Sequence, residues 1–331
     1  MASPARVLRT EVDGFPAVTL AGPGDILRAT FIPSLGMVGC SLIDGDDELL
    51  ARRGGPPAYA ERGSSFGIPL LHPWANRLSS WTYTAGGRSV EIPHDSPVAH
   101  LDGATGLPMH GLLTASPNWV VVDATVDDDG APRLRAELDF AAHPALLAAF
   151  PFPHVVALDV SLRAGRLAVR LTLTPTGDVA VPISFGFHPY VRLPGSDRRT
   201  WSVELPVRRR AVLDGRGIPT GATDRVEDGE CSGRLGDRAF DDSFDELQAP
   251  PAGQPITFSV ADDRRRLAVE LVDGYTVAHV FAPAASDFIC FEPMTAPVDA
   301  LTTGDRLRSV APGSSFAAEF AISVAATTPA P

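Results

Sequence analysis

The chain has 331 residues, of which 44% are hydrophobic and 21% charged, and its formal net charge is −12. All 28 basic residues are arginine, so lysine Schiff-base chemistry and the lysine of a phosphate-binding P-loop are excluded. The acidic balance disfavours nucleic acid and anionic membrane surfaces as partners.

The three cysteines, Cys40, Cys231 and Cys290, are far apart in the chain and lack CxxC spacing. An odd and scattered set of this kind indicates neither a disulfide framework nor a structural zinc site, and it is typical of a reducing compartment. The first fifteen residues contain no apolar run, and no stretch approaches the roughly 18 apolar residues of a membrane span. We therefore expect a cytoplasmic protein without a membrane partner.

Segments in which apolar and polar residues alternate recur along the chain, as strands with one buried face require. Residues 156–162 and 167–173 show this pattern on either side of Gly165, which predicts a hairpin. In chain order, strands are expected over residues 26–32, 119–125, 134–140, 156–162, 167–173, 256–260, 267–272, 276–281, 288–292 and 316–324.

The pattern elsewhere favours turns. Residues 143–150 form the only convincing helical stretch, whereas 30 glycines and 31 prolines interrupt the chain as they do in all-β proteins. The expected fold class is all-β, a large antiparallel β-sandwich with few short helices. No repeat of fixed period and no linker divides the sequence, so we expect one domain over residues 1–331, with a frayed, disordered tail at 325–331.

Two polar residues interrupt apolar segments and precede proline: His188 in FGFHPY and Glu292 in FICFEPM. Each has an ordinary interpretation, His188 as a core histidine bonded to a backbone carbonyl and Glu292 as an outward carboxylate at a strand end. A desolvated glutamate would instead have its pKa raised toward neutrality, where it is useful as a base. Together the two residues suggest an acid and a base that face one cleft.

The segments around these residues resemble those of the aldose 1-epimerase (galactose mutarotase) family. HPYVRLPG (188–195) is similar to the family's HPYFNLPG stretch, and FEPMTAPVDAL (291–301) resembles its EPMT segment with a following proline. PWANRL (73–78) resembles the PW-x-NRI segment, and HGL follows at 110–112. The resemblance runs from about residue 30 to the C-terminal strand. One departure lies after APG (311–313), where Ser314 replaces the usual acidic residue.

The resemblance implies a galactose mutarotase-like supersandwich and an isomerase that interconverts the α and β anomers of a hexose without a cofactor or a metal ion. It makes Glu292 the base that removes the anomeric proton, and His188, which begins protonated, the acid that protonates the ring oxygen. Arg77 and His110 then contact sugar hydroxyls, and Asn76 is a further candidate. The implied partner is a monosaccharide, and the sequence indicates no oligomeric state.

Two more positions resemble sugar-binding positions of the family. Asp241, the first aspartate of DDSF (241–244), matches an aspartate that bonds the sugar, and we prefer it over Asp242. His279, in AHVF (278–281), falls where relatives often carry a glutamine near the substrate, although an ordinary polar strand residue is an equally good interpretation. A wall for the sugar face is expected from three aromatic residues, Trp74, Phe187 and Tyr190.

Other interpretations stay open at this point. GSSFG (63–67) matches the GxSxG nucleophile elbow of α/β-hydrolases, but glycines and prolines surround it in place of the strand and helix that an elbow requires. The arginine runs 208–210 and 264–266 could bind the phosphate of a hexose 6-phosphate, since guanidinium groups suit phosphate oxygens. The same fold could also serve a non-catalytic carbohydrate-binding or sensing module.

Overall fold

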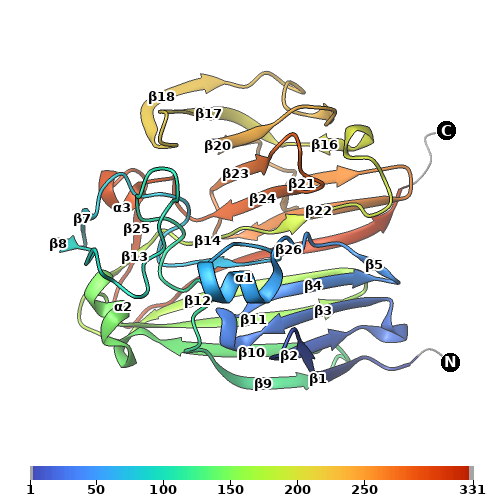
Figure 1. Cartoon of the computed structure of the whole chain (residues 1–331), viewed down its shortest axis with the longest axis horizontal. Coiled ribbons are helices and arrows are strands. Elements are labelled where there is room, and N and C mark those ends of the chain that lie inside the picture. Colours follow the sequence, from blue (N-terminus) through green and yellow to red (C-terminus); the bar gives the residue numbers. More distant parts are fainter. Residues whose placement is uncertain (1–2, 328–331) are drawn as a thin grey trace.

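The computed structural model describes residues 3–327, which form mainly antiparallel β-strands (Figure 1). One layer is a nine-stranded sheet. Its strands are, in spatial order, β19 (Gly233–Arg234), β16 (Ser202–Glu204), β21 (Ile256–Ala261), β22 (Arg265–Asp273), β26 (Phe316–Ala326), β12 (Arg166–Pro175), β11 (His154–Arg163), β10 (Pro132–Asp139) and β9 (Val120–Val126).

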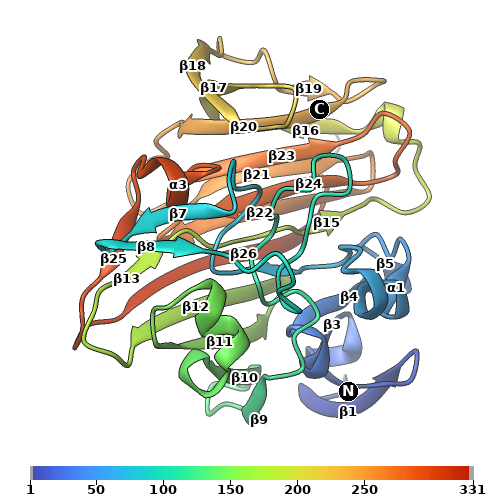
Figure 2. The same cartoon turned by 60° about the vertical axis from the view of Figure 1, so that its left-hand side comes forward.

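The facing layer contains two sheets (Figure 2). The first has five strands in chain order, β1 (Arg6–Val12), β2 (Phe15–Ala21), β3 (Leu27–Ile32), β4 (Val38–Asp44) and β5 (Asp47–Glu48). The second has eight, in the order β18 (Pro219–Arg225), β17 (Val207–Leu213), β20 (Phe240–Leu247), β23 (Val277–Ala282), β24 (Ile289–Met294), β14 (Gly186–Phe187) and β6 (Leu70–Leu71), with β15 (Tyr190–Val191) also paired to β24.

Short elements close the ends of the sandwich. Two small ribbons pair β7 (Thr82–Ala85) with β8 (Arg88–Glu91), and β13 (Val181–Ile183) with β25 (Arg308–Val310). The helices are α1 (Gly55–Arg62), α2 (Pro144–Ala149) and α3 (Ala300–Thr303). Across residues 3–327, none of these helices has the length and apolar character needed to cross a membrane.

The hydrophobic core lies between the two layers. Phe258 of β21 faces Phe291 of β24, with ring centroids 5.8 Å apart, and Phe320 of β26 lies 4.9 Å from Phe187 of β14. Each of these rings is almost completely buried. The expected antiparallel β-sandwich is therefore confirmed, because side chains from the inner faces of both layers interdigitate.

The predicted strands occur in the structure with shifts of a few residues at their ends. β10 alternates as expected, with the side chains of Leu134 and Leu138 buried. β11 and β12 form the predicted hairpin, in which Arg163 pairs with Arg166 and Gly165 takes the left-handed conformation at φ +78°. The helix expected at 143–150 is α2, which begins after His143.

Helix α1 was missed because its first residues, GGPP (54–57), have the composition of a turn. Proline is tolerated there, since the first N–H groups of a helix have no intrahelical partner. Gly63 ends the helix at φ +63° and its N–H donates to the Tyr59 carbonyl at 2.9 Å. A helix therefore leads into GSSFG (63–67), which is not the strand–turn–helix arrangement of a nucleophile elbow.

The tail expected from residue 325 was placed too early. β26 continues to Ala326, and Ala325 and Ala326 pair with Arg266 and Arg265 of β22. The long neighbouring strand offers backbone partners to these last residues, so the ladder extends as far as partners are available. The remainder of the predicted tail, residues 328–331, lies outside the described residues.

Candidate active site

A cleft of about 310 Å³ opens on the face of the eight-stranded sheet that is turned away from the core. Its orientation follows from strand geometry: Phe291 points into the core, so Glu292, the next residue of β24, points to the opposite face. All seven residues predicted for the site line this cleft, namely Asn76, Arg77, His110, His188, Asp241, His279 and Glu292.

His188 and Glu292 meet because of strand register. Gly186 of β14 lies opposite Met294 of β24, and Tyr190 of β15 lies opposite Cys290. Between these two pairs, His188 falls opposite Glu292, and its Nε2 is 3.1 Å from the Glu292 Oε1. Pro189 interrupts the ladder at this point, and the His188 ring stacks on Tyr190 at 4.3 Å between centroids.

Both members of this pair are buried, with side-chain exposures of 6% for His188 and 1% for Glu292. Burial penalises charge on each, which lowers the pKa of His188 well below its usual value and raises that of Glu292 to about 8. At neutral pH the free pair therefore holds one proton, mainly on Glu292. This differs from the expectation that His188 begins protonated, because that expectation took no account of desolvation.

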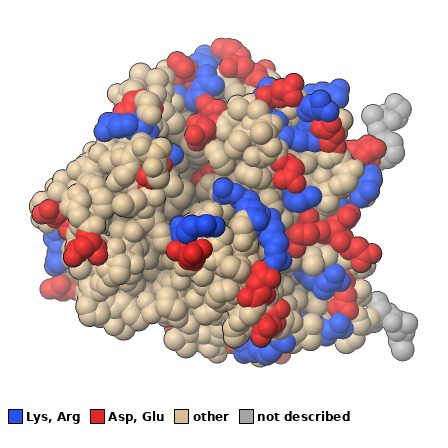
Figure 3. Space-filling model, viewed as in Figure 1, with Lys and Arg blue, Asp and Glu red and all other residues tan. Residues whose placement is uncertain are grey.

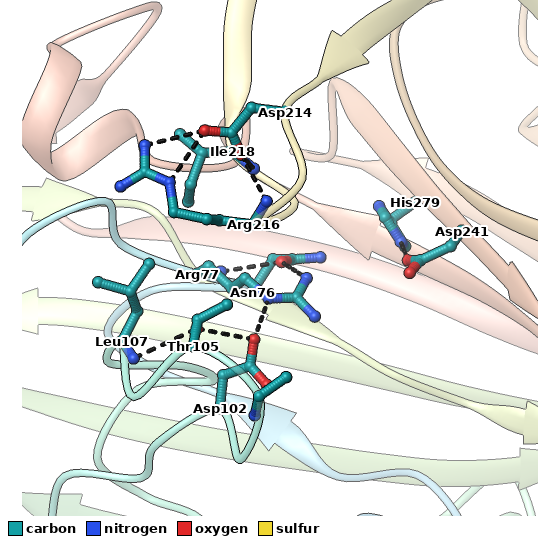
Figure 4. Close-up of polar contacts among 11 residues, drawn as sticks. Asn76, Arg77, Asp102, Thr105, Leu107, Asp214, Arg216, Ile218, Asp241 and His279 are labelled. Atoms are coloured by element: carbon teal, nitrogen blue, oxygen red, sulfur yellow. Dashed lines mark hydrogen bonds and ion pairs between the residues drawn. The ribbon is translucent and has the colours of Figure 1, made fainter.

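Arg77 enters the cleft from the loop that precedes β7 and is fixed at several points (Figure 4). Its Nε donates to Oδ2 of Asp102 at 2.8 Å, and its Nη1 donates to Oδ1 of Asn76 at 3.1 Å. Asn76 takes the left-handed conformation, φ +56°, which asparagine tolerates better than most residues. The side-chain oxygen of Asn76 thus accepts a hydrogen bond from Arg77 and orients it. The amide NH₂ of Asn76 takes no part in this contact.

His110 is held by an unusual backbone. Its φ is +63°, and its N–H donates to the Asn76 carbonyl at 2.8 Å. A Cβ on the following Gly111 would lie 2.2 Å from the His72 carbonyl oxygen, so only glycine fits there. The His110 ring meets His188 edge to face at 5.6 Å. Burial, with the nearby Arg77 charge, lowers the pKa of His110 to about 3, so this imidazole is neutral.

Asp241 and His279 lie on the opposite side of the cleft from Arg77 (Figure 4). His279 Nε2 donates to Asp241 Oδ1 at 2.9 Å. Burial opposes charge on His279, but the carboxylates of Glu292 and Asp241 together raise its pKa above the usual value. Asp242, the neighbour that we preferred less, is not among the cleft residues and lies 3.7 Å from Arg210.

Sequence reasoning missed part of the cleft and misplaced part of its wall. Tyr190 lines the cleft as expected, whereas Trp74 and Phe187 are buried in the core. Phe187 turns inward because it alternates with His188, its neighbour in the chain. The missed lining residues come from the segment after Arg52, from other loops and from strand β23; they are Arg53, Arg62, Gly63, Ser64, Ser65, His100, Leu101, Met109, Thr114 and Phe281.

Comparisons with known proteins place the chain in a family. Residues 43–323 match the family model for aldose 1-epimerase, so the chain belongs to the aldose 1-epimerase family. Over 165 residues it is 27% identical to the uncharacterized protein YihR of Escherichia coli K12, a match that spans 46% of this chain and about half, 47%, of that relative.

Solved structures share the fold at low sequence identity. A galactose mutarotase-like protein from Clostridium acetobutylicum superimposes with a TM-score of 0.84 at 16% identity, over 98% of this chain and 99% of that one. A galactose 1-epimerase from Lactobacillus acidophilus NCFM gives 0.75 at 14% identity, over 98% and 100%. A putative aldose 1-epimerase from Escherichia coli K12 gives 0.68 at 18%, over 91% and 97%. The fold is therefore galactose mutarotase-like.

Proposed function

We propose that this protein is a mutarotase that interconverts the α and β anomers of a hexose, with His188 and Glu292 as its acid and base. The observation that carries the proposal is the 3.1 Å contact between His188 Nε2 and Glu292 Oε1, in a cleft of monosaccharide size. Family membership supports the reaction class. That the substrate is an unphosphorylated hexose is also part of the proposal.

The proposed reaction balances with one proton on the pair. Glu292 removes the proton of the anomeric hydroxyl, the bond from C1 to the ring oxygen breaks, and His188 gives its proton to the ring oxygen. An open-chain aldehyde results, with the proton now on Glu292. Rotation about C1–C2 presents the other carbonyl face, and the same transfers run backward to close the ring.

The protonation state of the free site matches that of the open-chain stage of the reaction. Burial favours the proton on Glu292 and a neutral His188, which is the arrangement reached with the open-chain sugar. A cyclic sugar requires the alternative arrangement, reached by moving one proton across the 3.1 Å contact.

The remaining cleft residues would position the sugar. Arg77 is held by Asn76 and Asp102, so its guanidinium offers fixed donors to ring hydroxyls. Neutral His110 and the outer oxygen of Asp241 supply further polar contacts. The three cysteines are buried and unpaired, which supports our proposal of a reducing, cytoplasmic location.

A hexose 6-phosphate epimerase is the second candidate. The arginine runs 208–210 and 264–266 do not line the cleft, so they do not support it. Arg53 and Arg62 do line the cleft, and their guanidinium groups could bind a phosphate there. Figure 3 shows basic side chains near the centre of one face, in the region that α1 occupies in Figure 1.

Polarimetry with purified protein tests both candidates. We expect the anomerisation of α-glucose or α-galactose to be accelerated, and a Glu292→Gln variant to return the rate to background. Acceleration with α-glucose 6-phosphate alone, lost on replacing Arg53 and Arg62 with Gln, would favour the second candidate. A well-folded protein that accelerates none of the three sugars would indicate a non-catalytic binding module.

A further inference from the structure

Three polar side chains lie side by side across neighbouring strands, and two of them, His279 and Glu292, line the cleft. In the antiparallel registers, Ser243 of β20 is opposite His279 of β23, and His279 is opposite Glu292 of β24. Directly opposed side chains in antiparallel sheets have their Cβ atoms about 4.5–5.5 Å apart. His279 is therefore an immediate neighbour of Glu292 on the side away from His188.

His279 and Glu292 each have one polar atom with a partner and one without. His279 gives its Nε2 to Asp241, and Glu292 gives its Oε1 to His188. The other atoms, His279 Nδ1 and Glu292 Oε2, are buried and have no hydrogen-bond partner within residues 3–327. His279 is only 2% exposed, while the Asp241 side chain is 60% exposed. The Asp241 charge is thus screened by solvent, and that of His279 is not.

We propose that protonated His279, held by Asp241, is a positioning residue that sets the pH range over which the His188–Glu292 pair holds its single working proton. The inference rests on the proposed roles of His188 and Glu292. His279 does not exchange a proton with the sugar in this scheme. It supplies a fixed positive charge beside the base, and Asp241 keeps that charge in place.

The direction of the effect follows from charge. A buried positive charge favours the less protonated form of its neighbours, so protonated His279 lowers the pKa of both Glu292 and His188. Both limits of the one-proton range therefore move to lower pH. The ionisable groups that face His279 from the elements around it are Asp241 on β20, Glu292 on β24, Arg77 and His110 on the loops, and His188 between β14 and β15. Asp242 lies near His279 as well, but its side chain is outside the cleft.

The residue type matters at this position. The resemblance places a glutamine there in many relatives, and a glutamine amide could donate to Asp241 as the imidazole does. It could not carry a charge. His279→Gln therefore separates the two properties of the residue, because it keeps a donor of similar reach and removes the positive charge.

The test is the pH profile of kcat/KM, measured by polarimetry for the unmodified protein, His279→Gln and Ser243→Ala. Ser243 is a matched control because it lies opposite His279, is buried, and carries no charge. For His279→Gln we expect both limbs of the profile to move to higher pH by about one to two units, as removal of a buried charge about 6 Å away predicts. Ser243→Ala should leave both limbs in place.

A second measurement tests the charge of His279 directly. Nuclear magnetic resonance of ¹⁵N-histidine-labelled protein should show one imidazole still protonated at pH 7, and this signal should be missing in His279→Gln. An unshifted profile in His279→Gln, or a neutral His279 at pH 7, would overturn the inference while leaving the mutarotase proposal intact. Full activity of Glu292→Gln would instead overturn the mutarotase proposal itself.

Discussion

The protein buries two groups of histidines, and the contrast between them bears on how a site is recognised. The cleft group consists of His110, His188 and His279. The core pair consists of His72 and His154, both 0% exposed, whose Nε2 atoms are 2.9 Å apart. His154 Nδ1 donates to the Phe152 carbonyl, so its Nε2 is the acceptor for the Nε2–H of His72.

Burial lowers the pKa of most of these imidazoles, and His279 of the cleft is the exception. In the core pair, burial lowers the pKa of both imidazoles, that of His154 to about 4, and aromatic rings such as Phe140 surround them. In the cleft, carboxylates lie beside the rings, and the pKa of His279 rises in spite of burial. A buried histidine is therefore no sign of function in itself. A carboxylate opposite it and an opening to solvent are what distinguish the site.

The largest expected effect is the loss of activity when a histidine of the cleft group is replaced. Replacement of His188 with Asn removes the proposed acid, so turnover should fall by about 10² to 10⁴-fold, the usual contribution of such a group. The melting temperature should change little, because Asn is smaller and keeps a polar group in the space that the imidazole fills. Polarimetry and thermal unfolding measure the two quantities. Near-normal mutarotation by a folded His188→Asn protein is the result that would remove His188 from the mechanism.

The strands were predictable from sequence and the meeting of the site residues was not. Alternation locates β10 to β12 because burial on one face acts residue by residue. Register is a property of two strands at once, so the 104 positions between His188 and Glu292 carry no information about their 3.1 Å contact. Their shared setting before proline in apolar segments suggested one cleft, and the family resemblance assigned the two roles.

Supporting residues escaped sequence reasoning for a related reason. Asp102 fixes Arg77 from a distance of 25 positions in the chain, and an aspartate in a loop is too common to be noticed. Arg53 and the Ser64–Ser65 segment line the cleft because α1 turns the chain toward it, and α1 itself was missed. Residues that act through backbone placement leave no pattern in a single sequence.

The core pair should affect how the free energy of unfolding depends on pH. Its pKa values are lowered in the folded state, so the unfolded chain binds more protons between pH 6.5 and about 4, and the free energy of unfolding falls as the pH is lowered through this range. We expect His154 alone to account for about 3 kcal/mol of that loss. Urea unfolding of His154→Gln should show a shallower pH dependence. An unchanged slope would contradict the assigned role.

A smaller effect is expected where a charge only orients another residue. Asp102→Asn weakens the bond that fixes Arg77, so KM should rise by about tenfold, equivalent to the loss of one charged hydrogen bond. The kcat should change little, since Arg77 would contact sugar hydroxyls throughout the reaction. Asp242→Asn is the matched control, because Asp242 contacts Arg210 outside the cleft. Equal kinetic changes in both variants would count against this role for Asp102.

The pH dependence of activity sharpens the comparison furthest, because only the cleft group lies beside the proposed acid and base. Above about pH 8 Glu292 loses the single proton of the pair, so no donor remains and kcat/KM should fall about tenfold per unit. At acidic pH a second proton on His188 removes the base, and the low pKa of that imidazole places this limb below the usual histidine range. His154→Gln should reproduce the same bell shape, since neither histidine of the core pair lines the cleft. A profile that stays flat from pH 5 to 9 would show that proton transfer within the pair does not limit the reaction.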